Sequence, residues 1–175
     1  MESLVDIEQS LYWLQSICYQ GKRLLDSYQI NGYLTHTITR MEEHFFLVAC
    51  QKATRWINKL QAQNILSEEI RIFKEKVSVK LVRDKREHDD EYQGTNAKDE
   101  KLSDVSNPNS ELTIKVGQSI TMKRNSRYYI GGTLDVHTTM EIVNQLFKPL
   151  KEIQHAYWEK RGAPHFKIPD VLISK

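Results

Sequence analysis

Arg83, Asp84 and His88 place three side chains of complementary chemistry in one short stretch of this 175-residue chain. Four residues separate the arginine from the histidine, and the aspartate directly follows the arginine. An imidazole, with an unperturbed pKa of about 6.5, exchanges protons at neutral pH. A guanidinium donates paired hydrogen bonds to anionic oxygens. The stretch VSVKLVRDKREHDDEY, residues 77–92, is therefore the candidate site.

The same stretch also has a purely structural interpretation. Opposite charges stand four residues apart in it, and on a helix such residues form weak ion pairs. The pairs are Arg83–Glu87, Lys85–Asp89 and Arg86–Asp90. On one straight helix, at about 100° per residue, Arg83 and His88 point about 140° apart. They converge only if the helix breaks near Asp84, or if two copies of the chain share a symmetric site.

Two long amphipathic helices are expected before this stretch. The first is capped by Ser3 and ends near the turn at residues 29–32. Its buried stripe is Leu4, Ile7, Leu11, Leu14, Cys18, Gly21 and Leu25. The second begins after Thr39, which forms a capping-box pattern with Glu42. Its stripe is Met41, Phe45, Val48, Lys52, Trp56 and Leu60, flanked by Phe46, Ala49, Ala53 and Ile57. This breadth indicates the central helix of a bundle.

A third helix is predicted to start at Ser67, where Glu68 and Glu69 favour the positive end of the helix dipole. Its apolar positions step by three or four toward the candidate site. They are Ile70, Phe73, Val77 and Leu81, after which the stripe points to Asp84 and His88. The seam that holds this helix in the bundle is therefore expected to run directly into the polar cluster.

The second half of the chain changes period. Residues 94–110 are rich in turn formers and predict a mobile loop. Residues 111–136 alternate apolar and polar side chains, which predicts a small antiparallel β-meander with turns near Gly117 and at Arg124-Asn-Ser. A last long helix follows, with Thr138 and Glu141 as its capping box. Pro149 is expected to kink it and Gly162 to end it. The tail from residue 165 has no firm assignment.

Two segments, MEEHFFLVACQKATRWI and VRDKREHDDEY, together resemble the second and third helices of the HEPN superfamily, whose motif is an arginine and a histidine four to six residues apart. The resemblance covers residues 1–93 and 137–162 and implies a mainly α, four- to five-helix bundle in which the β-meander is an insertion. It implies a metal-independent endoribonuclease of toxin or defence type, working as a homodimer and restrained by an antitoxin protein.

The resemblance also assigns roles within the motif. His88 would act as general base or acid on the RNA 2′-hydroxyl, and Arg83 would stabilise charge on the phosphoryl group. Asp84 would orient the arginine or set the histidine tautomer. In the branch regulated by nucleotidyltransferases a tyrosine stands two residues after the histidine. This chain has Asp90 there, which puts that regulation in doubt.

Contact with RNA requires a basic surface, and the β-meander is the best candidate for it. Its cations are Lys115, Lys123, Arg124 and Arg127, which with Glu111 give a net charge of +3 over residues 111–127. Tyr128 and Tyr129 stand beside them for base stacking. The alternative is a solvated hairpin whose edge is protected by charge.

Composition limits the remaining possibilities. The chain has the length of one domain, residues 1–175, and a net charge of only +2, so a basic footprint must be local. Cys18 and Cys50 are expected to be core residues of a cytoplasmic protein. No signal peptide, membrane span, cofactor loop or second cluster of metal ligands is recognisable, so no cofactor or metal is expected. The alternative function is a non-catalytic helical module that dimerises or binds a protein or nucleotide.

Overall fold

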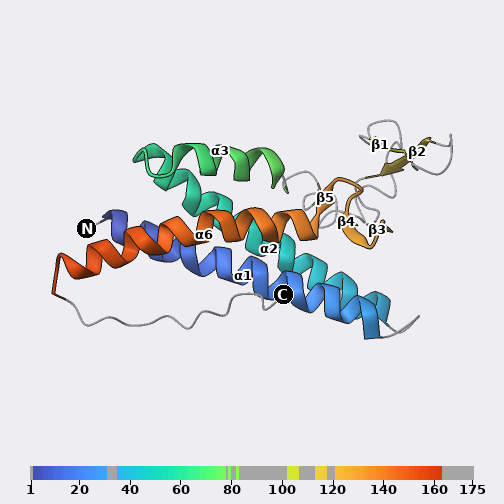
Figure 1. Cartoon of the computed structure of the whole chain (residues 1–175). Helices are drawn as coiled ribbons and strands as arrows, with labels where there is room; N and C mark the ends of the chain where they lie inside the picture. The colour runs from blue at the N-terminus through green and yellow to red at the C-terminus, as the bar shows by residue number, and fades with distance from the viewer. Residues whose placement is uncertain are drawn as a thin grey trace, which may run out of the picture.

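The computed structural model describes residues 2–30, 35–77, 79, 82, 102–106, 113–117 and 121–162, and side chains within 4–27, 38–77, 79, 82 and 125–162. The chain is mainly α-helical, as the periodicity predicts, with short antiparallel strands before the last helix (Figure 1). The helices are α1 (Glu2–Ile30), α2 (Thr35–Ala62), α3 (Ser67–Lys76) and α6 (Val136–Glu159). The strands are β1 (Leu102–Ser106), β2 (Thr113–Gly117), β3 (Thr121–Arg124), β4 (Arg127–Ile130) and β5 (Leu134–Asp135).

The long helices α1 and α2 pack side by side, and α6 packs against α1. They share one apolar core, because each helix places a branched or aromatic residue toward it every three or four positions. At the centre, α1 carries Gly21, where a Cβ atom would lie 2.5 Å from Met140 Sδ and 3.1 Å from Phe46 Cε2. Glycine therefore lets α1 approach both of its neighbours.

The predicted stripe of α2 was displaced around the helix. Met41 and Phe45, expected in the core, are 54% and 47% exposed. Leu60 of the predicted stripe is buried, as are the four residues predicted to flank it, Phe46, Ala49, Ala53 and Ile57, together with Leu47 and Cys50. Thr39 is also not the helix start, because α2 already includes Thr35. A helix with apolar residues around most of its circumference does not reveal from periodicity alone which of them face the core.

The helix α3 begins at Ser67, as predicted, but ends earlier than its stripe indicated. Its N-cap is Leu66 in a left-handed conformation, and Glu68 and Glu69 occupy the first turn. Val77 forms its C-cap and is buried, as are Val79 and Val82, while Leu81 lies outside the described residues. The candidate motif is therefore not a continuation of α3.

The strands pair differently from the predicted meander. β1 lies within residues 94–110, where a loop was expected, and pairs with β2, while β3, β4 and β5 form a second sheet. The predicted turn at Asn125 and Ser126 is confirmed: both have positive φ, which suits a two-residue hairpin. Gly131 and Gly132, also at positive φ, turn the chain from β4 into β5. Pairing of distant strands is set by tertiary packing, which local alternation does not report.

The last helix begins three residues earlier than the Thr138 capping box predicts. Asp135 is the N-cap of α6, and its carboxylate accepts hydrogen bonds from the backbone N–H groups of His137 and Thr138. The helix continues past Pro149 to Glu159, and Gly162 follows at a φ of 60°. The predicted end of the helix is confirmed, while the tail from residue 163 lies outside the described residues.

Candidate functional site

The three predicted catalytic residues, Arg83, Asp84 and His88, lie outside the residues that the structure describes. What precedes them is described. Val82 is helical, only 2% exposed, and belongs to the same apolar core as α1, α2 and α6. The motif therefore starts one residue after a position that is anchored in the core.

The predicted substrate-binding residues belong to the β3–β4 hairpin. Lys123 is paired with Tyr128 across the two strands, and Arg124 with Arg127, next to the turn. The backbone register thus gathers all four residues at one end of the hairpin. The side chains of Lys123 and Arg124 lie outside the described part of the chain, so their role in RNA binding stays a prediction.

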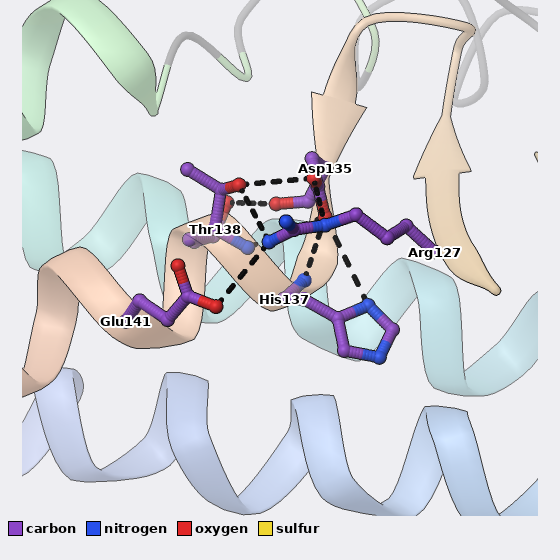
Figure 2. Close-up of polar contacts among 6 residues, drawn as sticks. Arg127, Asp135, His137, Thr138 and Glu141 are labelled. Carbon is purple, nitrogen blue, oxygen red and sulfur yellow. Dashed lines mark hydrogen bonds and ion pairs between the residues drawn. The ribbon is translucent and has the colours of Figure 1, made fainter. Parts of the chain in front are cut away.

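Arg127 is engaged by the beginning of α6 (Figure 2). Its Nε lies 2.8 Å from Asp135 Oδ2, and its Nη2 donates to Thr138 Oγ1 at 3.0 Å and to Glu141 Oε1 at 3.3 Å. Because Asp135 is also the N-cap of α6, one carboxylate joins the hairpin to the helix. The guanidinium, expected on the basic RNA-binding surface, instead has two carboxylates as neighbours and connects β4 to α6.

Tyr128, expected to stack on a base, is instead 2% exposed. Its hydroxyl donates a hydrogen bond of 2.5 Å to Oε1 of Glu43, which is also 2% exposed. A ring in this position has no free face for a nucleobase. In β4, Tyr128 and Ile130 are buried while Arg127 and Tyr129 are partly exposed. Because side chains alternate between the two faces of a strand, Tyr128 shares the face of the apolar Ile130, and this alternation could have predicted its burial.

The start of α6 also holds a histidine that the sequence did not single out. His137 Nδ1 lies 3.9 Å from Asp135 Oδ1, beyond hydrogen-bonding distance, and this buried atom has no hydrogen-bond partner. His137 and Arg127 thus flank one carboxylate, as Figure 2 shows. A histidine next to a carboxylate is also found in acid–base pairs. Here, however, the contacts of Arg127 connect β4 to α6, and Asp135 caps the helix.

The acidic residues of α1 and α2 that face inward are paired with cations or hydroxyl groups. Glu42 Oε1 accepts a hydrogen bond of 2.5 Å from Arg23 Nη2, which raises the pKa of the guanidinium above its usual value. Asp6 Oδ1 lies 3.4 Å from Lys59 Nζ. These pairs connect α1 and α2 at the two ends of their contact, and Glu42 serves this purpose rather than the predicted capping box.

Cys18 and Cys50 are free, buried thiols, as predicted. Burial raises the pKa of Cys18 to about 12 and also raises the pKa of Cys50. A thiol in this state is neutral at physiological pH and is a poor nucleophile. Among the described side chains no group of three or more histidine, cysteine or acidic residues is placed to hold a metal ion. None of the described helices is long and apolar enough to span a membrane.

Comparison with known proteins gives no relative. No protein-family model matches the chain, and searches of curated proteins and of solved structures return no significant match. These comparisons therefore do not test the resemblance to the HEPN superfamily.

Proposed function

We propose that this chain is a metal-independent endoribonuclease of toxin or defence type. The observation that carries the proposal is the motif itself: Arg83 and His88, with Asp84, in a mainly helical chain. Val82, the residue directly before the motif, is buried in the core. A buried residue directly before the motif supports the proposal, because a catalytic pair must start from a well-anchored part of the chain.

The reaction needs only groups that RNA and the motif supply. One imidazole removes the proton of the 2′-hydroxyl, and the oxygen attacks the adjacent phosphorus. The bond to the 5′-oxygen breaks, and that oxygen takes a proton from a general acid. Arg83 donates hydrogen bonds to the phosphoryl oxygens as negative charge develops there. The products are a 2′,3′-cyclic phosphate and a 5′-hydroxyl, and DNA is not a substrate.

Two copies of the chain are part of the proposal. Within a single helix, Arg83 and His88 diverge by about 140° at 100° per residue. A two-fold axis brings the same residue to a shared site twice, so the arginine and histidine can come from different subunits. Substrate contact falls to Lys123 and Arg124, because Arg127 and Tyr128 have other partners. An antitoxin protein would hold the activity in check.

The decisive experiment incubates the purified chain with end-labelled RNA in EDTA. We expect cleavage that leaves cyclic-phosphate ends, and a fall in rate of at least about 100-fold for His88→Ala and for Arg83→Ala. Arg86→Ala, in the same charged stretch but outside the motif, is the matched control and should retain activity. Intact RNA with the wild-type chain, or equal cleavage by all variants, would contradict the proposal.

A second candidate function is a non-catalytic dimerisation or binding module, which is favoured by the exposed apolar side chains of α1 and α2. The double variant Arg83→Glu with Glu87→Arg separates the two functions. If these residues only form an ion pair, the reversal should preserve every property of the chain. If Arg83 binds phosphate, the variant should fold normally and lose cleavage.

A further inference from the structure

Within the part of the chain whose side chains are described, the large apolar side chains that are exposed gather on two helices. Among the described residues, all six large hydrophobic side chains that are exposed belong to α1 or α2. They are Val5, Tyr12, Tyr19, Ile38, Met41 and Phe45, each between 47% and 59% exposed. With about 200 Å² for a large side chain, they expose roughly 600 Å² together. Their summed area approaches the roughly 800 Å² per partner of a stable interface.

These side chains form two matching rows. On α1, Val5, Tyr12 and Tyr19 stand seven residues apart and therefore lie on one line along the helix. On α2, Ile38 and Phe45 begin a row of the same spacing that continues with Lys52 and Lys59. Seven-residue spacing on both helices is the pattern of a seam between long helices.

Two ion pairs place the rows on the same side of the hairpin. At one end Arg23 lies 5.8 Å from the centre of the Tyr19 ring and also binds Glu42 of α2. At the other end Lys59 lies over the Trp56 ring at 3.8 Å and contacts Asp6 of α1. Both rows thus border the line where α1 meets α2.

The same pairs fix the register of the two antiparallel helices. With Arg23 beside Glu42 and Lys59 beside Asp6, the two rows stand level to within one residue. Tyr19 is level with Phe45, Tyr12 with Lys52, and Val5 with Lys59. The α1 row is uncharged, and the cations lie in the α2 row.

We propose that this face, defined by the six side chains together with Lys52 and Lys59, binds a second copy of the chain, with each α1 lying against the partner's α2. A two-fold axis parallel to the helices brings Tyr19 against the partner's Phe45 and Tyr12 against the partner's Lys52. Lys52 then meets a tyrosine ring, a favourable contact, and Lys59 meets Val5, so neither cation faces another cation. The two hairpins form a four-helix arrangement. This proposal rests on α1 and α2 alone and is independent of catalysis.

Light scattering coupled to size-exclusion chromatography tests the proposal on the full chain. We expect twice the 20.6 kDa mass of one chain. Tyr12→Lys sets like charges against each other across the interface and should raise the dissociation constant at least about tenfold. Adding Lys52→Glu should restore the dimer, which unfolding would not allow. Gln145→Lys, the same change of charge on the exposed surface of α6, is the control and should remain dimeric.

Cysteine pairing tests which helices meet. A mixture of the Tyr19→Cys and Phe45→Cys chains should form a disulfide-linked dimer under mild oxidation, and neither chain alone should do so. A monomer at every concentration, an unaffected Tyr12→Lys dimer, or failure of the Lys52→Glu rescue would overturn the proposal. So would a chain that dimerises only after removal of residues 163–175, because its own tail would then occupy the face. Arg83→Ala should remain dimeric, so loss of cleavage and loss of dimer are distinguishable.

Discussion

Asp135 joins the first turn of α6 to the β3–β4 hairpin. It caps α6 through two backbone N–H groups, accepts a hydrogen bond of 2.9 Å from the Thr138 hydroxyl and lies against Arg127 of β4. A short acidic side chain immediately before a helix satisfies N–H groups that have no partner within the helix. Its removal therefore disturbs both a helix end and a strand.

Replacing Asp135 with alanine should lower the free energy of unfolding by about 1–2 kcal/mol, through loss of the cap. Urea denaturation followed by circular dichroism measures the change. Glu141→Ala is the control: Glu141 also contacts Arg127, but its side chain is 65% exposed, so its loss should cost less than about 0.5 kcal/mol. Equal effects of the two substitutions would show that the cap contributes nothing.

At the same scale, some residues were predictable and others were not. Cys18 and Cys50 stand in apolar helical patterns, and both are buried. The basic, aromatic stretch around Arg127 and Tyr128 predicts that both lie on a substrate surface. Arg127 contacts Asp135 at the start of α6, and Tyr128 contacts Glu43 of α2, 85 residues away. The composition of the stretch does not indicate such partners.

At the scale of elements, Gly21 determines how closely the helices approach. We expect Gly21→Leu to destabilise the fold by about 1–3 kcal/mol, because the new side chain must displace Met140 and Phe46 in a filled core. Thermal denaturation checks this. Lys22→Leu introduces the same side chain at the next, exposed position and should leave the melting temperature nearly unchanged. A stable Gly21→Leu chain would mean that α6 can shift away from α1.

Helices were easier to predict than their boundaries, for a physical reason. A repeating apolar stripe marks a helix over many turns, so α1, α2, α3 and α6 were all expected. Their ends depend on single residues, and Thr39 and Thr138 offered capping patterns that the longer helices include in their interiors. Strand partners were harder, since alternation reveals a strand but not whether β2 pairs with β1 or with β3.

At the scale of the whole molecule, the two thiols report on opening of the bundle. Cys18 of α1 donates a hydrogen bond to Asn144 Oδ1 of α6, and Cys50 lies in α2. We expect a thiol reagent at pH 8 to label neither cysteine in the native chain and both after unfolding in urea. Fast labelling without denaturant would mean that the helices separate locally.

The thiols also predict a pH dependence. The pKa of Cys18 is raised from the ordinary value of 9.0 to about 12 in the folded chain. The unfolded chain therefore loses this proton first, and the contribution to stability is complete below pH 9 and lost as the pH rises toward 12. Cys18→Ser removes a titrating thiol, so its urea midpoint should fall less than that of the wild type over this interval.

The candidate site was predictable only as a motif. The sequence identifies Arg83 and His88 by type and spacing, but α3 ends before them, so their orientation could not follow from the stripe of that helix. The interface proposed for α1 and α2 was hidden for the opposite reason. Met41 and Phe45 are apolar and regularly spaced, and such side chains are predicted to be buried within one chain even when a second chain would cover them.

No linker separates β5 from α6, since Asp135 is both the last residue of the strand and the cap of the helix. Twisting the β3–β4–β5 sheet would therefore unwind the first turn of α6 before it could bend any flexible joint. The sheet and α6 should therefore move together as one rigid unit, and α6 packs against α1. A molecule that tilted the hairpin would thus also shift α6 relative to α1.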